Sequence, residues 1–182
     1  MALSRPTGKR QAIELAVLRA TEGLLAGGSS YADLNVERIA TASGISRTAF
    51  YFYFRDKREL LMRLTADVND QLYAEADTWF TGDATPAEAI GRIAALYEEH
   101  GALLRAIVEV STYDEDIAQF WRSLIGRFIE ATEKRVGSRA TAFALVWMTE
   151  RTFYQQLVQG GPLDPDELVA ALAGIWEQAA TY

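Results

Sequence analysis

The stretch Val36–Lys57, VERIATASGISRTAFYFYFRDK, decides the fold. Ala40 is small, as is needed where two helices approach closely. Gly44 follows four residues later, where the turn between the helices needs a left-handed backbone that only glycine adopts at low cost. An apolar seam between the two helices can be built from Ile39, Ile45 and Phe50. The stretch therefore predicts a helix-turn-helix followed by the start of a supporting helix.

Short or polar side chains occupy the outward face of the second of these helices. Hydroxyl and guanidinium groups suit phosphates and base edges, and a small residue allows close approach to DNA. The expected DNA contacts on and just after this helix are Ser46, Arg47, Thr48, Ala49, Tyr51 and Tyr53. We expect three further residues to lie near the phosphates, at the starts of the flanking helices: Asn35, Val36 and Lys57.

The segment ISRTAFYFYFRDKREL, residues 45–60, resembles the signature of the TetR family of transcriptional regulators. The turn glycine, the hydroxyl-rich helix, the aromatic run and the Asp-Lys pair stand in the family's order. The resemblance extends over about residues 10–65 and implies an all-α, TetR-like fold. It also implies that Arg47, Thr48 and Tyr51 face the major groove, and that Tyr53 and Lys57 contact the DNA backbone.

The composition narrows the functional classes. The chain has 182 residues, no cysteine and one histidine, His100, so a disulfide framework, a zinc site and a Ser-His-Asp triad are all disfavoured. His100 precedes a glycine, and we expect it to end a helix. No apolar run has membrane-spanning length and no signal peptide is evident. We therefore expect a soluble cytoplasmic protein that is not an enzyme and uses no metal or other cofactor.

The charge is distributed unevenly along the chain. Residues 1–63 hold ten Lys or Arg and six Asp or Glu, a net charge of +4, whereas the remainder holds eight basic and nineteen acidic residues, a net charge of −11. A basic head on an acidic body is expected when only the head meets phosphate. An architectural DNA-binding protein without a ligand is the alternative from another class, but it would need a broad basic surface.

The rest of the chain also has helical periodicity and no strand pattern. In residues 1–55 the stripe Ile13, Val17, Ala20 and Leu24 indicates a helix that ends at Gly27-Gly28. Further helices are expected from Asp56 to about Gly82 and over about 88–99, 102–111, 114–136, 139–159 and 165–180. Capping signals lie at Asn35, Asp56–Glu59, Thr85–Glu88 and Asp164–Glu167. We predict nine helices: three in a DNA-binding domain, residues 1–55, and six in a ligand-binding and dimerisation domain, residues 56–182.

Aromatic residues concentrate in the last three long helical patterns. Apolar side chains at this spacing are more often plain core than a ligand cavity. Trp and Tyr are awkward core residues, however, because each carries a polar group that needs a partner. The motif WMTERTFY, residues 147–154, adds Thr149 and Glu150 beside the aromatics. For Glu150 and Arg151 we expect an ion pair at the surface or at an interface.

The same motif, the FYFYF run and the GIW near the end resemble the ethionamide-resistance repressor branch of the TetR family. That branch has a long, mostly apolar tunnel for lipophilic compounds, and an Asn where this chain has Thr149. The resemblance and the aromatic stripes predict a tunnel in this chain, with Thr149 as the main polar anchor. Its expected lining is Leu96, Phe120, Trp121, Ile125, Phe128, Trp147, Thr149, Phe153 and Trp176. No inward Lys or Arg is available for an anion, so a neutral or weakly polar effector is expected.

These observations predict a ligand-responsive regulator that binds double-stranded DNA. One recognition helix touches few base pairs, so we expect a homodimer on an inverted-repeat operator, joined by the helices near 139–159 and 165–180. Repression relieved by a small lipophilic effector is the first expectation, and activation by a protein of the same fold is the alternative.

Overall fold

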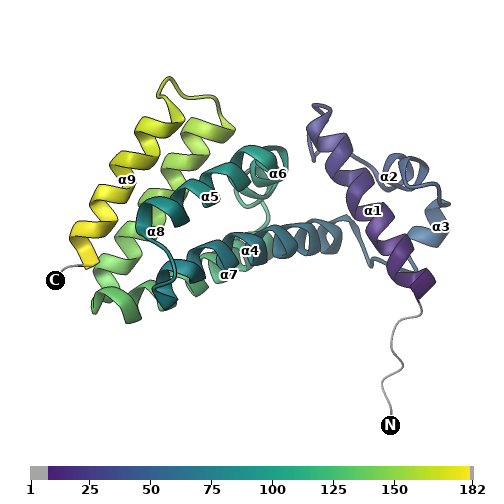
Figure 1. Cartoon of the computed structure of the whole chain (residues 1–182). Coiled ribbons are helices and arrows are strands. Elements are labelled where there is room, and N and C mark those ends of the chain that lie inside the picture. The colour runs from purple at the N-terminus through teal and green to yellow at the C-terminus, as the bar shows by residue number, and fades with distance from the viewer. Residues whose placement is uncertain (1–7, 181–182) are drawn as a thin grey trace, which may run out of the picture. The chain divides into compact units, whose positions relative to one another are not determined.

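The computed structural model describes residues 8–180, and within that range every regular element is helical (Figure 1). The nine α-helices of the described range are α1 (Gly8–Ala26), α2 (Val36–Ala42), α3 (Arg47–Phe50), α4 (Lys57–Thr81), α5 (Pro86–Glu99), α6 (Gly101–Val110), α7 (Glu115–Val136), α8 (Arg139–Phe153) and α9 (Pro165–Ala180). A π-helical turn, Tyr154–Val158, follows α8 directly. The predicted all-α fold is confirmed, but the helix expected over 139–159 changes its hydrogen-bond pattern at Tyr154.

The chain divides into two compact units, one ending at Leu64 and the other beginning at Thr65. We call residues 8–64 the head and residues 65–180 the body. The head unit ends later than the predicted domain boundary at residue 55, because the first turns of α4 pack within it. Leu60 and Leu61 have no exposed surface, and the Arg63 guanidinium pairs with Glu14 of α1 at 3.1 Å.

Capping residues fix where the helices begin. Asn35 Oδ1 accepts a hydrogen bond from the Arg38 backbone at the start of α2, as predicted. Thr85 and Glu88 form a complete capping box at the start of α5. At α4 the box is displaced, because Asp56 accepts from the Glu59 backbone while the Glu59 carboxylate accepts from the backbone of Arg55, not of Asp56. Local side-chain chemistry thus sets these boundaries.

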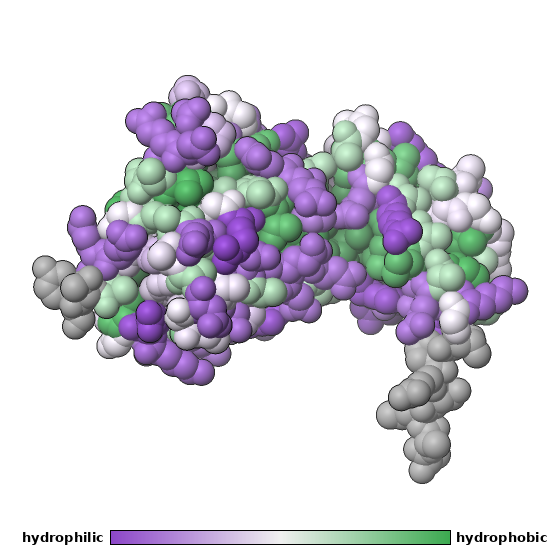
Figure 2. Space-filling view, viewed as in Figure 1, coloured by the Kyte–Doolittle hydropathy of each residue, from purple (hydrophilic) through white to green (hydrophobic). Residues whose placement is uncertain are grey.

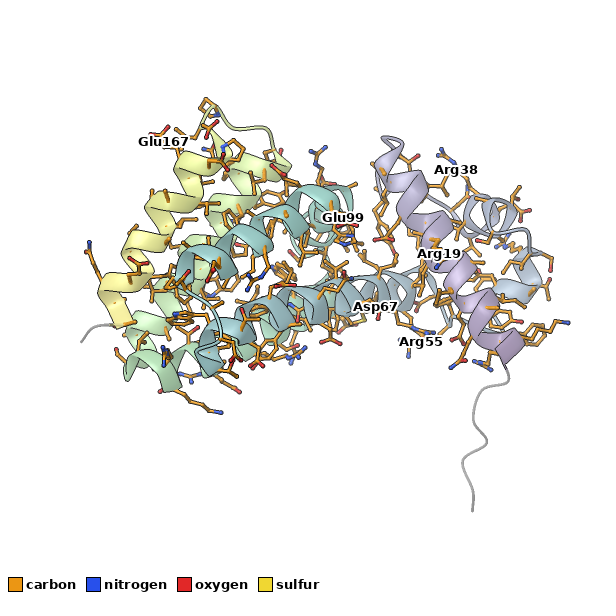
Figure 3. The ribbon with its side chains drawn as sticks, in the orientation of Figure 1. Arg19, Arg38, Arg55, Asp67, Glu99 and Glu167 are labelled. Atoms are coloured by element: carbon orange, nitrogen blue, oxygen red, sulfur yellow. The ribbon has the colours of Figure 1, made fainter. Side chains whose placement is uncertain are left out.

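The first turn of α9 is capped in a similar way. Asp164 Oδ1 accepts hydrogen bonds from the backbone N–H groups of Asp166 and Glu167, which is labelled in Figure 3. Pro165 stands at the first helical position, where a missing N–H group costs nothing. At the other end of α5, His100 is the C-terminal cap residue, as the sequence indicated.

The core of the head forms around the helix-turn-helix. Ile39, Ala40 and Phe50 have no exposed surface, and the Phe50 ring lies 5.4 Å from that of Phe54. Ile45 is only partly buried. The inward stripe of α1 differs from the expected one by one residue after Val17, because Val17, Thr21 and Leu25 are its buried positions. Thr21 is accommodated there because its hydroxyl donates to the Val17 carbonyl oxygen at 2.8 Å.

The body packs its helices in pairs, chiefly α7 with α8 and α5 with α9. Ile107 and Ile117 are fully buried, as is Phe153 at the end of α8. Hydrophilic residues cover much of the visible face of the body, and apolar residues show between them (Figure 2). Several large apolar side chains of the body are exposed, namely Tyr113, Phe143, Leu163 and Ile175.

Candidate nucleic-acid interface and ligand cavity

The turn of the helix-turn-helix depends on Gly44, whose φ angle is +70°. A residue with a Cβ rarely adopts that conformation. The turn is closed by backbone hydrogen bonds from Gly44 to Thr41, 3.1 Å, and from Ile45 to Ala40, 3.0 Å. Ser46 then begins α3, and its hydroxyl oxygen accepts from the Ala49 backbone at 3.1 Å. The sequence pattern therefore folds as expected at this turn.

The nine residues expected to meet DNA all lie in the head, and none of them is fully buried. Five are exposed, namely Asn35, Ser46, Arg47, Thr48 and Tyr51, whereas Val36, Ala49, Tyr53 and Lys57 are partly covered. Two of the exposed residues, Asn35 and Ser46, already use a side-chain oxygen to cap a helix. Their part in DNA binding stays a prediction, and capping gives each of them a structural role as well.

Two cationic side chains of the head lie on α1 and α2. The Arg10 guanidinium of α1 lies 5.7 Å from the centre of the Tyr53 ring, and it also pairs with Glu14 at 2.9 Å. Arg38 of α2, labelled in Figure 3, donates to the Ser29 hydroxyl oxygen at 2.8 Å. These positive groups agree with the basic charge of the head and add to its attraction for phosphate.

Phe52 is a residue that the sequence analysis left unassigned. It lies between Tyr51 and Tyr53, and its side chain is 72% exposed, the largest exposed fraction among the large apolar residues of the described chain. Apolar residues are visible on the surface around α3 (Figure 2). Phe50 and Phe54 are buried whereas Phe52 between them is exposed. The sequence did not distinguish Phe52, because all residues of this run are aromatic.

Lys57 holds the loop that precedes α2. Its ammonium group donates to the carbonyl oxygens of Tyr31 and Leu34, each at 2.8 Å, and lies 4.5 Å from the centre of the Tyr31 ring. The Tyr31 hydroxyl in turn donates to the Lys57 carbonyl oxygen. Burial lowers the pKa of Lys57, and the Asp33 carboxylate opposes this shift. The side chain expected to bind phosphate is thus engaged with the protein's own backbone.

Replacing Lys57 by methionine separates its two roles. Methionine keeps an apolar stem against Tyr31 but cannot donate, so we expect the free energy of unfolding to fall by roughly 1–3 kcal/mol. If Lys57 also binds phosphate, the slope of log K against log salt falls by about 0.9. Chemical denaturation and operator titrations at several salt concentrations measure the two effects, and an unchanged slope excludes the phosphate contact.

The body contains a cavity of about 80 Å³ that is partly open to solvent, with several times the space that one water needs. Its lining comes from five helices, α4, α5, α7, α8 and α9. Seven aromatic residues take part: Trp79, Phe80, Tyr97, Trp121, Phe128, Phe153 and Trp176. The Trp79 and Trp176 rings meet edge to face at 5.2 Å, and the Tyr97 and Phe153 rings lie 5.3 Å apart. The interior is therefore mostly apolar and largely aromatic.

Six of the nine side chains expected around a tunnel line this cavity, and three do not. The six are Trp121, Ile125, Phe128, Thr149, Phe153 and Trp176. Leu96, Phe120 and Trp147 lie outside the lining and are partly exposed. Each is displaced by a neighbour in the helix: Tyr97, Trp121 and Val146 take the inward positions. Adjacent helical residues differ by about 100° around the axis, so an error of one position moves a side chain off the cavity wall.

Thr149 keeps a polar role inside the cavity. Its hydroxyl oxygen accepts a hydrogen bond from the Trp176 indole N–H at 2.9 Å, with both residues buried. This bond satisfies the tryptophan, and the threonine's own hydroxyl hydrogen remains to be donated. Thr149 can still serve as a ligand anchor, as the sequence suggested, but as a donor.

The cavity wall also holds three polar side chains that the predicted lining omitted. Asn69, Thr132 and Glu150 are at most 4% exposed. Asn69 Nδ2, Thr132 Oγ1 and both Glu150 carboxyl oxygens have no hydrogen-bond partner. Glu150 is thus not the surface acid that the sequence led us to expect, although Arg151 Nε does lie 3.7 Å from its Oε2. Buried polar groups left unpaired are unfavourable, which makes this wall receptive to a polar partner.

The pH dependence of stability should reveal the buried Glu150. Burial raises its pKa above the usual 4.5, while the Arg151 guanidinium opposes the shift; Tyr97 is the other titratable group that interacts with it. A raised folded-state pKa contributes stability that is complete below the unfolded pKa and is lost as pH rises through the folded pKa. Thermal unfolding from pH 4 to 8 should therefore show Glu150→Gln gaining stability over the parent as pH rises above 4.5. The exposed Glu130→Gln variant is the control, and equal pH profiles for both variants would contradict the assignment.

Residues 8–180 contain no group of three or more His, Cys, Asp or Glu side chains placed to hold a metal ion. In the same range, no helix combines the length and the apolar character needed to cross a bilayer.

Comparison with known proteins gives the family of both parts. Residues 18–64 match the model of the bacterial regulatory proteins of the tetR family, and residues 87–181 match the C-terminal domain of the transcriptional regulator EthR. The HTH-type transcriptional regulator EthR of Mycolicibacterium smegmatis is 31% identical, with 95% of this chain and 87% of that protein covered. The EthR of Mycobacterium tuberculosis is 33% identical, with coverage of 95% and 88%.

Solved structures agree with this fold. A putative TetR-family regulator from Syntrophomonas wolfei superposes with a TM-score of 0.75 at 15% identity, covering 94% of this chain and 96% of its own. A tetR-family regulator from Streptomyces coelicolor gives a TM-score of 0.75 at 17% identity, covering 96% and 82%. The family consists of transcriptional regulators and not of enzymes, as the composition indicated. With its helix-turn-helix head and its EthR-type body, this chain belongs to the TetR family of DNA-binding transcriptional regulators.

Proposed function

We propose that this regulator is a homodimeric repressor, released from an inverted-repeat operator by a small lipophilic effector that binds the body cavity. One observation carries the proposal: α4, which begins at Lys57 beside the helix-turn-helix, supplies Leu72, Ala76 and Trp79 to the wall of an aromatic cavity. A ligand in that cavity therefore contacts α4, the helix whose first turns belong to the DNA-binding head. The protein would act in the cytoplasm, where bacterial operators lie.

The coupling works through a shift in α4. An effector that binds one position of α4 better than another changes the population of the two states. In a dimer, displaced α4 helices would carry the two recognition helices away from the spacing of about 34 Å that successive major grooves require. Roughly 1–3 kcal/mol of differential binding changes operator affinity about 5–150-fold.

The effector test combines fluorescence with operator binding. Trp79, Trp121 and Trp176 line the cavity, so a bound ligand should change their emission. Lipophilic esters, amides and fatty-acid analogues are titrated into the free protein and then into the operator complex. Binding that changes tryptophan emission and releases DNA supports the repressor. Increased transcription from the operator with the same ligand would favour an activator. Ligand binding that leaves operator binding unchanged would contradict an effector role.

The operator itself is found by selecting bound DNA from a random library. An inverted repeat in the selected sequences supports the dimeric docking, whereas no enrichment at fixed salt would favour an architectural protein.

Changes at Thr48 or Tyr51 should then alter sequence preference. Each lost base contact is expected to cost roughly 1–3 kcal/mol on the selected site and less on other sites. Competition titrations of Thr48→Ala and Tyr51→Ala against single-base operator variants measure this. A uniform loss of affinity on every sequence would instead place these side chains on phosphates.

A further inference from the structure

The part of the chain that the structure describes places a single carboxyl group in the aromatic wall of the cavity. Glu150 is 4% exposed and lies on the same inward stripe of α8 as Val146 and Phe153. Neither of its carboxyl oxygens receives a hydrogen bond. Among residues 8–180, no Lys, Arg or His side chain contributes to the lining, so this acid has no cation from the described chain opposite it within the cavity.

Arg151 does not supply Glu150 with a hydrogen bond. Its guanidinium lies 3.7 Å from one oxygen of Glu150, beyond hydrogen-bond distance, and the arginine side chain is 51% exposed. It also lies 5.3 Å from the centre of the Tyr154 ring. Arg151 is therefore shared with solvent and with an aromatic face.

The aromatic wall suits the same kind of ligand as the carboxyl group. Faces of Trp, Tyr and Phe attract cations, most strongly where water is excluded. Seven aromatic residues line the cavity. An anion would meet an acid and no basic group, whereas an N–H group would meet an unpaired acceptor. A charged carboxylate or ammonium group is costly to bury alone in an apolar site. The cost falls when the two are paired by a hydrogen bond.

We infer that the cavity selects lipophilic compounds that carry a basic amine, with the N–H group of the ligand donating to Glu150. Asn69 Nδ2 and the Thr132 hydroxyl, the other unpaired groups of the wall, are available for a further polar atom of such a ligand. Burial raises the pKa of Glu150 and the Arg151 guanidinium opposes that shift, so a cation bound beside the carboxyl group would favour its ionised form further. The inference rests on the proposed effector function and adds a charge preference that the sequence did not indicate.

The test compares phenylalkyl ligands of similar size that differ in their polar group. 3-Phenylpropylamine, 3-phenylpropan-1-ol and 4-phenylbutan-2-one are titrated into the full-length protein at pH 7, with tryptophan fluorescence and calorimetry as readouts. The amine should bind about 10–100-fold more tightly than the alcohol, the range expected for a charge-assisted hydrogen bond in a buried site. This comparison needs no variant.

Two variants at one position then locate the preference. Glu150→Gln should remove the advantage of the amine while changing alcohol binding by less than about threefold, and Glu150→Leu provides a second variant if the first folds poorly. Glu130→Gln removes the same charge from an exposed position of α7 and should leave all three affinities unchanged. Arg151→Met should preserve or increase the preference for the amine.

Several results would overturn the inference. These are equal binding of amine and alcohol, an amine preference that survives both Glu150 variants, tighter binding of the ketone that tolerates Glu150→Gln, or no binding of the amine. Operator titrations distinguish a wrong amine preference from a wrong effector role. If neutral compounds release DNA without any amine preference, only the charge preference is lost. If the amine binds through Glu150 but leaves the operator complex intact, the chemistry of the cavity stands and the effector role does not.

Discussion

Phe50→Ala is expected to abolish DNA binding by unfolding the head. Phe50 has no exposed surface and its ring lies against those of Tyr51 and Phe54. Truncating a fully buried phenylalanine costs about 3–5 kcal/mol, a large part of the roughly 5–15 kcal/mol that holds a typical domain together. Chemical denaturation followed by circular dichroism measures the loss of stability, and fluorescence anisotropy with labelled operator measures binding.

Phe52→Ala is the matched control, two residues away in the same aromatic run. Its side chain is 72% exposed, so removing it should change the free energy of unfolding by no more than about 0.5 kcal/mol. Weaker operator binding by this variant with unchanged stability would place Phe52 at the DNA interface. Equal destabilisation by the two variants would contradict the burial pattern on which the helix-turn-helix assignment depends.

Phe143→Glu is expected to separate the proposed dimer and to lower operator affinity by about 100-fold or more. Two linked heads gain roughly 10²–10⁴ in affinity over one head, because the second contact becomes intramolecular. Phe143 is 56% exposed on α8, its ring lies 6.3 Å from that of Trp147, and Ile175 of α9 is also exposed. A charge at the centre of an apolar contact would have to be buried without a partner.

Tyr113→Glu provides the control for this variant. Tyr113 follows α6 and is not part of either helix proposed to form the interface, and it is 67% exposed. Sedimentation velocity at micromolar concentration should give dimers for the parent and for Tyr113→Glu, and monomers for Phe143→Glu. If the parent protein is monomeric and binds the operator with full affinity, the dimer proposal has to be abandoned.

The amino-acid sequence by itself determined the helices, most of their ends and the helix-turn-helix. These features depend on residues at most four positions apart, such as the cap at Asn35, the box of Thr85 and Glu88, and the positive φ angle of Gly44. Such interactions form within one segment, so their residue types can be read in order along the chain.

Only the tertiary structure decided which side of each body helix faces the cavity. Helix α8 carries large apolar residues on both sides, Phe143 and Trp147 outward and Val146 and Phe153 inward, so hydrophobicity did not distinguish the two. The packing of α7, with which α8 makes its most extensive contact, places Glu150 inside. Likewise, Lys57 meets the carbonyl oxygens of Tyr31 and Leu34, which lie more than twenty residues earlier in the chain. The burial and the partners of a charged side chain depend on groups that are distant in the sequence. The local spacing of residues therefore does not predict them.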